Sequence, residues 1–154
     1  MVDVKVSMQA VAARRLVAVR RKVTIPEVAT SWRPALERVW EFVRKHPGVW
    51  TNGQTIFHYR HGVSRDAPME IDFGVEVTRS IKPEGEVYAT ETPAGQVVTA
   101  VHVGRYACLG QTHEAIQAWC SANKCTIAGQ SWEIYGDWTD DETKLKTVVC
   151  YLLR

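Results

Sequence analysis

A seven-residue stretch occurs twice in the chain, in similar form, with its two copies almost half a chain length apart. Residues 53–59 read Gly-Gln-Thr-Ile-Phe-His-Tyr, and residues 129–135 read Gly-Gln-Ser-Trp-Glu-Ile-Tyr. Each copy follows an amphipathic segment and precedes an apolar run, so the order of elements repeats together with the letters. In a chain of 154 residues, this pattern predicts an internal duplication. We expect one domain with pseudo-repeats at about residues 15–80 and 86–154.

The first half predicts a strand, a helix and two further strands. Residues 16–23 alternate and are rich in valine, which is typical of a strand. Residues 30–46 have the period of an amphipathic helix, and residues 54–60 and 69–78 predict an antiparallel pair. An additional short strand is expected at residues 2–6. The apolar face of the helix is predicted to contain Leu36, Val39, Trp40 and Val43.

The second half repeats this plan after strands at residues 87–92 and 96–103. A helix is expected over residues 109–123, and strands follow around residues 132–135 and at residues 145–153. The predicted fold class is α+β, in which a tandem strand-helix-strand-strand repeat forms a curved antiparallel sheet with two helices on one face. We expect the opposite face to form a ligand cleft between the repeats, lined by residues that include Phe57, Tyr59, Glu133 and Tyr135.

Glu133 is the acidic residue in the second copy of the repeated stretch. Strand alternation places Glu133 and Tyr135 on one face, and Trp132 and Ile134 on the other. A carboxylate among aromatic rings is costly to bury unless a partner compensates its charge. Glu133 is therefore either a solvated residue at a strand edge or a carboxylate that receives a cationic ligand. The aligned residue in the first copy is Phe57, and this asymmetry favours a specialised site.

Composition excludes several other classes of function. The net charge is +2, with 19 basic and 17 acidic residues, so no global field favours direct nucleic-acid binding. The basic clusters at residues 14–15 and 20–22 are interpreted as solvated strand positions. Asp3 and Lys5 interrupt any secretory signal, and no apolar run is long enough to span a membrane. A cytoplasmic protein is therefore expected.

The four cysteines do not have the spacing of a metal site. No pair forms a Cys-x-x-Cys sequence, and none has a histidine at zinc-finger distance, so neither a metal nor a cofactor is expected. We interpret the cysteines as reduced and mostly buried. Cys108 and Cys120 flank or lie on a predicted helix, which leaves a catalytic thiol as an alternative.

Taken together, the ordered segments resemble the GyrI-like small-molecule-binding family, which includes the effector domains of multidrug-responsive transcription regulators of the MerR and AraC types. The similarity extends from about residue 16 to residue 153. The segments that carry it are residues 101–106 (Val-His-Val-Gly-Arg-Tyr), 116–119 (Ile-Gln-Ala-Trp), 132–135 (Trp-Glu-Ile-Tyr) and 71–77 (Ile-Asp-Phe-Gly-Val-Glu-Val).

The resemblance implies a central cavity for cationic, aromatic, lipophilic compounds, with Glu133 as its acidic group and Tyr106 at the Gly-x-Tyr turn. It also implies a stand-alone effector domain, because no helix-turn-helix fits before Leu16; transcription control would then require a separate regulator as partner. Cation–π attraction is the physical role expected for an aromatic cage. The candidates for the cage are Tyr106, Tyr135, Tyr59, Phe57 and Trp138, with ordinary core packing as the alternative for each.

Two other functions remain open on the sequence. One is hydrolysis of reactive small molecules, with Glu133 as general base and Tyr106 or Tyr135 as proton donor. The other is protein binding, such as inhibition of a topoisomerase. Three histidines, His58, His102 and His113, are interpreted as structural. The natural ligand and the oligomeric state do not follow from the sequence.

Overall fold

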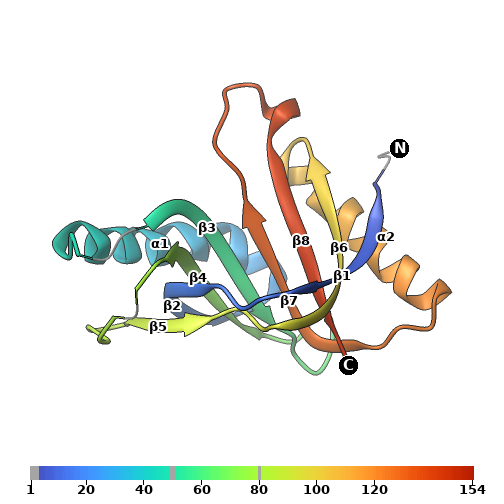
Figure 1. Ribbon diagram of the computed structural model, residues 1–154, viewed down its shortest axis with the longest axis horizontal. Coiled ribbons are helices and arrows are strands. Elements are labelled where there is room, and N and C mark those ends of the chain that lie inside the picture. Colours follow the sequence, from blue (N-terminus) through green and yellow to red (C-terminus); the bar gives the residue numbers. More distant parts are fainter. Residues whose placement is uncertain (1–3, 49–50, 80) are drawn as a thin grey trace. The chain divides into compact units, whose positions relative to one another are not determined.

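The computed structural model describes residues 4–48, 51–79 and 81–154. The chain forms two compact units, which are considered separately (Figure 1). Unit 1 combines the N-terminal residues up to Ala12 with residues 93–154, and unit 2 comprises residues 13–92. Both contain antiparallel strands and one long helix, so the α+β class predicted from the sequence is confirmed.

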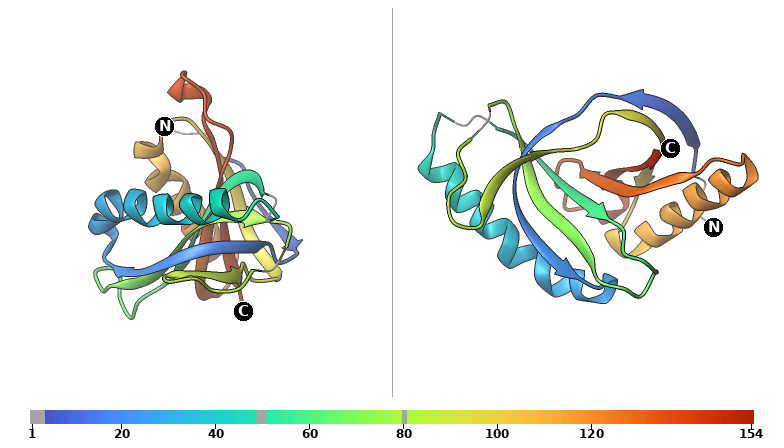
Figure 2. Two further views of the ribbon diagram at one scale, coloured as in Figure 1. Left: turned by 90° about the vertical axis from the view of Figure 1, so that its left-hand side faces the viewer. Right: turned by 90° about the horizontal axis from the view of Figure 1, so that it is seen from below.

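Unit 2 is a four-stranded antiparallel sheet with the order β3-β4-β2-β5. Helix α1 packs along β2 and β4, as the right-hand view of Figure 2 shows. The helix begins two residues before the predicted start, because Thr24 and Glu27 form a capping box that nucleates the preceding turn. The elements are β2 (Arg15–Val23), η1 (Ile25–Glu27), α1 (Val28–Lys45), β3 (Thr51–Arg60), β4 (Met69–Val77) and β5 (Val87–Glu91).

Unit 1 has the corresponding order β1-β6-β8-β7, with α2 packed against β6. Figure 1 shows α2 beside β6 and β1. Its elements are β1 (Val6–Val11), β6 (Gly95–Val103), η2 (Tyr106–Cys108), α2 (Leu109–Ala122), β7 (Ile127–Tyr135), η3 (Glu142–Lys144) and β8 (Lys146–Leu153).

The strand register confirms the tandem repeat. Phe57 lies opposite Phe73 in unit 2, and Glu133 lies opposite Val149 in unit 1, so both partners shift by the offset that separates the two copies in the sequence. The remaining pairs of β3 with β4 and of β7 with β8 follow the same offset, as does the irregularity near the start of β3 and β7. The helices begin at Val28 and Leu109, with a slightly larger offset than the strands. Positions in one unit therefore map directly onto the other.

The edge strands do not follow chain order. β5, which begins the predicted second repeat, pairs with β2 in unit 2, whereas β1 pairs with β6 in unit 1. The strand predicted at residues 2–6 is wrong in position, because β1 begins at Val6; residues 2 and 3 lie outside the described residues. β1 is exposed along its middle and only its ends are half-buried, so it lacks the alternation that locates a half-buried strand in a sequence.

Each helix packs through a narrow stripe. The buried residues of α1 are Ala35, Val39 and Phe42, whereas the predicted Leu36, Trp40 and Val43 are only half-buried beside this stripe. In unit 1, Ile116 and Cys120 of α2 join a core cluster with strand residues of β6 and β8. The face of each sheet beneath its helix is therefore the apolar core of that unit.

The sequence analysis assigned the candidate residues to the wrong face of the sheet. The ring of Phe57 lies 6.3 Å from that of Trp32 on α1, and Glu133 contacts His113 on α2. Both side chains therefore point toward the helix of their own unit, not away from it. Strand alternation correctly grouped Glu133 with Tyr135, but alternation alone does not say which face a helix covers.

Candidate functional site

Glu133 lies near the end of β7, beneath α2, with only 5% of its surface exposed. A register shift in β7 between Ile127 and Ser131 precedes it. Gly129 lies in this irregularity with φ of +82°, a conformation that favours glycine over residues with a Cβ atom. The glycine of the repeated stretch thus allows the irregularity after which the strand presents Glu133 to the helix.

Two side chains donate hydrogen bonds to the Glu133 carboxylate. The Tyr135 hydroxyl donates to Oε1 over 2.6 Å, and His113 Nε2 lies 2.7 Å from Oε2. An ionised carboxylate accepts only, so Nε2 carries a proton in this pair. These charge-assisted bonds compensate part of the cost of burying the carboxylate.

The opposite side of the His113 ring is also fixed. Its Nδ1 lies 2.6 Å from the Tyr151 hydroxyl, and Gln117 Nε2 donates to the same hydroxyl oxygen over 3.2 Å. In neutral imidazole with its proton on Nε2, Nδ1 accepts the Tyr151 hydroxyl proton. Burial raises the pKa of Tyr151 to about 12, so this proton is retained at neutral pH. We call Glu133, His113, Tyr151, Tyr135 and Gln117 the Glu133 cluster.

Tyr106 borders the cluster at the start of α2. Its ring is perpendicular to that of Tyr135, with centroids 5.5 Å apart, and 39% of its surface is exposed. Burial of the remainder raises the pKa of Tyr106. Buried His102 holds the preceding turn, because its Nε2 donates to the Arg105 carbonyl over 2.9 Å while Nδ1 contacts the Thr112 hydroxyl at 2.7 Å. Tyr106 thus provides an accessible aromatic surface next to a buried carboxylate.

The remaining predicted cage residues are Phe57 and Tyr59 of unit 2 and Trp138, which follows β7. Phe57 belongs to unit 2, where its ring packs edge-on against Phe73 at 4.8 Å and near Trp32. Tyr59 is half-buried on the same strand. Trp138 follows the end of β7 and is 69% exposed. The structure therefore brings together Glu133, Tyr135 and Tyr106, and the ligand role of the other three stays a prediction.

Sequence reasoning missed His113, Tyr151 and Gln117. His113 was interpreted as structural, and no base or charged partner for it was identified. In the structure, alignment of the two helices at their first residues places His113 on Trp32. The aligned strands likewise place Glu133 on Phe57, which contacts Trp32. The contact between His113 and Glu133 therefore corresponds to that between Trp32 and Phe57, but the alignment requires the helix starts that the structure gives, because the predicted starts at residues 30 and 109 would align His113 with Pro34.

Unit 2 contains a second buried carboxylate, that of Asp72, which the sequence analysis also did not single out. Arg20 Nε donates to it over 3.0 Å and Arg60 Nη1 over 2.7 Å, and the Tyr88 hydroxyl donates as well. Burial by itself raises the pKa of Asp72, but the hydrogen bonds from Arg20, Tyr88 and Arg60 outweigh it and hold that pKa below its ordinary value. Arg20 is therefore a partner of a buried charge and not simply a solvated residue.

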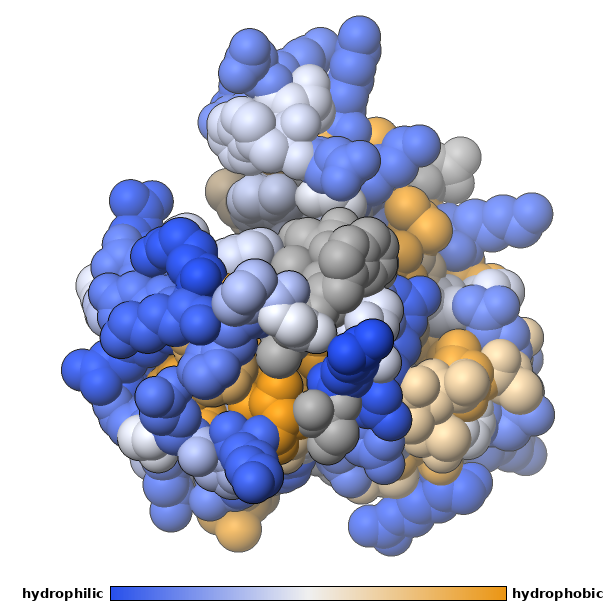
Figure 3. Space-filling view, turned by 60° about the vertical axis from the view of Figure 1, so that its left-hand side comes forward, coloured by the Kyte–Doolittle hydropathy of each residue, from blue (hydrophilic) through white to orange (hydrophobic). Residues whose placement is uncertain are grey.

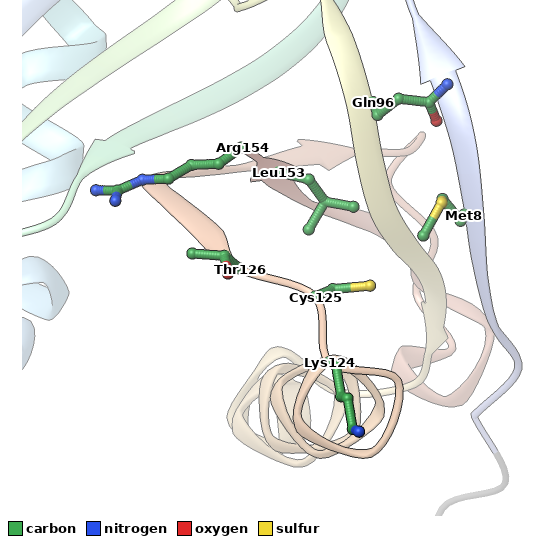
Figure 4. A pocket seen from close by; sticks show the side chains of 7 residues that line it. All are labelled: Met8, Gln96, Lys124, Cys125, Thr126, Leu153 and Arg154. Carbon is green, nitrogen blue, oxygen red and sulfur yellow. The ribbon is translucent and has the colours of Figure 1, made fainter.

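A hollow of about 580 Å³ lies elsewhere in unit 1 (Figure 4). It contains no member of the Glu133 cluster and is lined by Met8, Gln96, Lys124, Cys125, Thr126, Leu153 and Arg154. On the face shown in Figure 3, hydrophilic residues predominate and hydrophobic residues occupy small areas. Within the described residues, no group of three or more potential metal ligands is clustered. Neither described helix is both long and apolar enough to cross a lipid bilayer.

Comparison with known proteins adds a family and a fold. A family model described as the GyrI-like small molecule binding domain matches residues 5–153. The crystal structure of the EcmrR C-terminal domain superimposes with a TM-score of 0.82 at 18% identity, covering 98% of each chain. The EcmrR chain in a DNA complex has the same TM-score and identity, and this chain spans 57% of its length.

A third structure holds a ligand. SAV2435 bound to tetraphenylphosphonium has a TM-score of 0.73 at 13% identity, with 97% of this chain and 94% of that chain covered. No curated protein matches the chain significantly. At these identities the solved structures establish the fold, while the family model establishes a small-molecule-binding domain.

Proposed function

Because this chain belongs to the GyrI-like family of small-molecule-binding domains, we propose that it binds cationic, aromatic, lipophilic compounds at the Glu133 cluster and acts as a sensor or sequestering module. The observation that carries the proposal is a buried carboxylate bordered by two perpendicular tyrosine rings. The likeness to SAV2435, whose structure contains tetraphenylphosphonium, supports this class of ligand.

The physics favours a delocalised cation over a small hydrated one. A carboxylate in a low-dielectric environment attracts a positive charge more strongly than it does in water. A lipophilic cation loses little hydration when it approaches, and the faces of Tyr106 and Tyr135 add roughly 0.5–2 kcal/mol each by cation–π attraction. Because these forces have weak directional demands, we expect the selectivity for ligand shape to be broad.

The decisive experiment compares a cation with a neutral molecule of similar shape. Tetraphenylphosphonium and triphenylphosphine oxide are titrated into the wild type and into Glu133→Gln. We expect the variant to bind the cation at least about 10-fold more weakly, which corresponds to about 1.4 kcal/mol. Binding of the neutral compound should change by less than about twofold. Equal losses for both compounds would contradict charge pairing.

A matched control is available on α2. Glu114 is exposed one residue after His113, so Glu114→Gln removes the same formal charge without changing the cluster. This variant should bind tetraphenylphosphonium like the wild type. Mass spectrometry of the ligand after hours with the protein tests the hydrolase alternative, which requires products whose masses add up to that of the ligand plus one water molecule.

A role in transcription is a further part of the proposal. It rests on the likeness to EcmrR, which has been solved in complex with DNA. The role requires that ligand binding at the Glu133 cluster changes the activity of a DNA-binding partner. Co-purification with such a partner, in the presence and absence of tetraphenylphosphonium, tests it.

A further inference from the structure

Thr147 is a fully buried polar residue of unit 1 that the proposed function does not use. Its hydroxyl has no hydrogen-bond partner among the residues that the structure describes. Buried hydroxyls are nearly always paired, and an unpaired one costs free energy because its bonds to water are lost on folding. An unpaired hydroxyl beside a candidate binding site is therefore a candidate for a contact that forms only with a ligand.

The strand register places Thr147 next to the Glu133 cluster. β8 lies between β6 and β7 (Figure 1), and Thr147 is directly opposite Tyr135 on β7 and His102 on β6. Residues that are directly opposite share one face of the sheet, with Cβ atoms about 4.5–5.5 Å apart. Val149, two residues further along β8, is opposite Glu133. Thr147 therefore lies on the helix-covered face that carries Glu133, beside Tyr135.

The neighbours of Thr147 direct their hydrogen bonds to other groups. Both ring nitrogens of His102 are engaged, one with a backbone carbonyl at 2.9 Å and the other with the Thr112 hydroxyl at 2.7 Å. The Tyr135 hydroxyl donates its proton to Glu133 over 2.6 Å. A threonine hydroxyl donates one hydrogen bond and has two lone pairs that accept. A ligand group of either kind would therefore find a partner at Thr147.

We propose that Thr147 is a specificity-determining residue of the ligand site, and that the preferred ligands are aromatic cations that also carry an alcohol or amide group. The inference rests on the proposed function and deepens it. Glu133 attracts the positive charge of the ligand, whereas Thr147 forms a hydrogen bond with its neutral polar group. A ligand without such a group leaves the hydroxyl unpaired and is bound less tightly.

Access to Thr147 requires a movement, because its side chain is fully buried. Tyr106 is the residue that we expect to move. Its ring is 39% exposed and contacts the ring of Tyr135, which is the neighbour of Thr147 on β7. Tyr106 is the first residue of η2, a helix of only three residues. Because short 3₁₀ turns have poor hydrogen-bond geometry, we expect Tyr106 to move while β7 and β8 stay paired.

The test compares two cations of nearly equal shape that differ in one polar group. They are (4-hydroxymethylphenyl)triphenylphosphonium and (4-ethylphenyl)triphenylphosphonium, and the two 3-substituted isomers form a second pair. In at least one pair, the wild type should bind the hydroxymethyl compound at least as tightly as the ethyl compound. In Thr147→Val, which is isosteric, the preference should shift toward the ethyl compound by at least about fivefold. Thr147→Ser, which keeps the hydroxyl, should retain the wild-type preference.

Thr99→Val is the matched control, because Thr99 is also buried in unit 1 but its hydroxyl donates to the Val149 carbonyl over 2.8 Å. This variant should retain the wild-type preference and have a lower urea midpoint, whereas Thr147→Val should leave the midpoint unchanged or raise it. Equal losses of stability would mean that the Thr147 hydroxyl is already paired in the free protein, which overturns the inference. An unchanged preference in Thr147→Val overturns it too, as does tighter binding of the ethyl compound by the wild type in both pairs. If the wild type bound none of these cations, the proposed function would fail as well.

Discussion

The two repeats place different chemistry at one equivalent position beneath their helices. In unit 2 the position is apolar, and in unit 1 it is polar, although the strands have the same register and each helix packs against the corresponding strand, β2 or β6. The set in unit 2 is Trp32, Leu36, Phe57 and Val75; the aligned set in unit 1 is His113, Gln117, Glu133 and Tyr151. Four aligned side chains therefore differ in polarity between the units, whereas the strand register is the same.

The apolar residue of unit 2 and the polar residue of unit 1 contribute differently to the free energy of unfolding. Burying a phenylalanine contributes about 1.5–3 kcal/mol, whereas burying a carboxylate costs free energy unless hydrogen bonds compensate it. Unit 1 forgoes the apolar contribution at Glu133 and surrounds the carboxylate with donors instead. A position that lowers stability relative to its own repeat is a candidate for a functional residue.

The largest effect on stability is expected when a glutamate is introduced at position 57 of unit 2, which aligns with Glu133 of unit 1. Phe57→Glu should reduce the free energy of unfolding by about 4 kcal/mol, because it removes a buried ring and introduces a charge among apolar residues. Phe57→Leu, the control, should cost about 1 kcal/mol. Urea unfolding measures both. If the two variants were equally stable, position 57 would tolerate charge as position 133 does, and the contrast between the repeats would fail.

A double variant sharpens this test. Trp32→His combined with Phe57→Glu recreates in unit 2 the contact between His113 and Glu133. A double-mutant cycle should then give a favourable coupling of at least about 1 kcal/mol. A coupling near zero would mean that the surrounding tyrosine and glutamine of unit 1 are necessary for the pair.

The next largest effect compares the two buried carboxylates. Asp72→Asn should cost about 3 kcal/mol, because Arg20 and Arg60 lose the charge that balances them. Glu133→Gln should cost less than about 1 kcal/mol, since the amide still accepts a hydrogen bond and no buried charge remains. Unfolding of both variants in urea measures the difference. Equal costs would assign Glu133 a structural role like that of Asp72.

The strands and helices were largely predictable because their signals are local. Alternating valines located β2 and β6 to within one residue, and the helical period located α2 equally well. β7 was predicted only around residues 132–135, although it begins at Ile127, because its irregular first residues lack alternation. Local patterns therefore gave the elements but not their irregular ends.

The candidate site was only partly predictable, because it depends on contacts between elements. Glu133 and Tyr135 follow from strand alternation, but the partners of Glu133 come from α2 and β8. Nothing in the sequence near His113 indicates that its ring meets two strands. Likewise, Asp72 and its partner Arg20 are separated by 52 residues, and only the pairing of β2 with β4 brings them together.

Acidification should destabilise unit 2 through Asp72. The pKa of Asp72 is lower in the folded protein than its ordinary value of 3.8, so the folded state binds fewer protons than the unfolded state. The stabilisation is therefore complete above that ordinary value and is lost as pH falls toward the folded pKa. We expect a loss of at most about 1.4 kcal/mol per pH unit from this group. Urea midpoints from pH 5 downward should decline less steeply in Asp72→Asn than in the wild type; parallel declines would exclude Asp72 as the cause.

The smallest effect on stability is expected when the Tyr151 hydroxyl, which contacts His113 Nδ1, is removed. Tyr151→Phe keeps the ring in the core of unit 1 but removes the partner of His113 Nδ1 and of Gln117. The aligned residue of unit 2 is Val75, so the fold does not require a hydroxyl at this position, and we expect a loss of only about 1 kcal/mol. Tyr106→Phe, which changes a half-exposed ring at the border of the cluster, should leave stability unchanged.

The informative measurement for Tyr151→Phe is the nitrogen chemical shift of the His113 ring. Loss of the proton that Tyr151 donates should change the Nδ1 signal in the neutral form and leave Nε2 bonded to Glu133. An unchanged spectrum would mean that the hydroxyl does not fix the tautomer. The four polar residues of unit 1 would then not form one hydrogen-bonded group. Only the pair of Glu133 and His113 would distinguish unit 1 from unit 2.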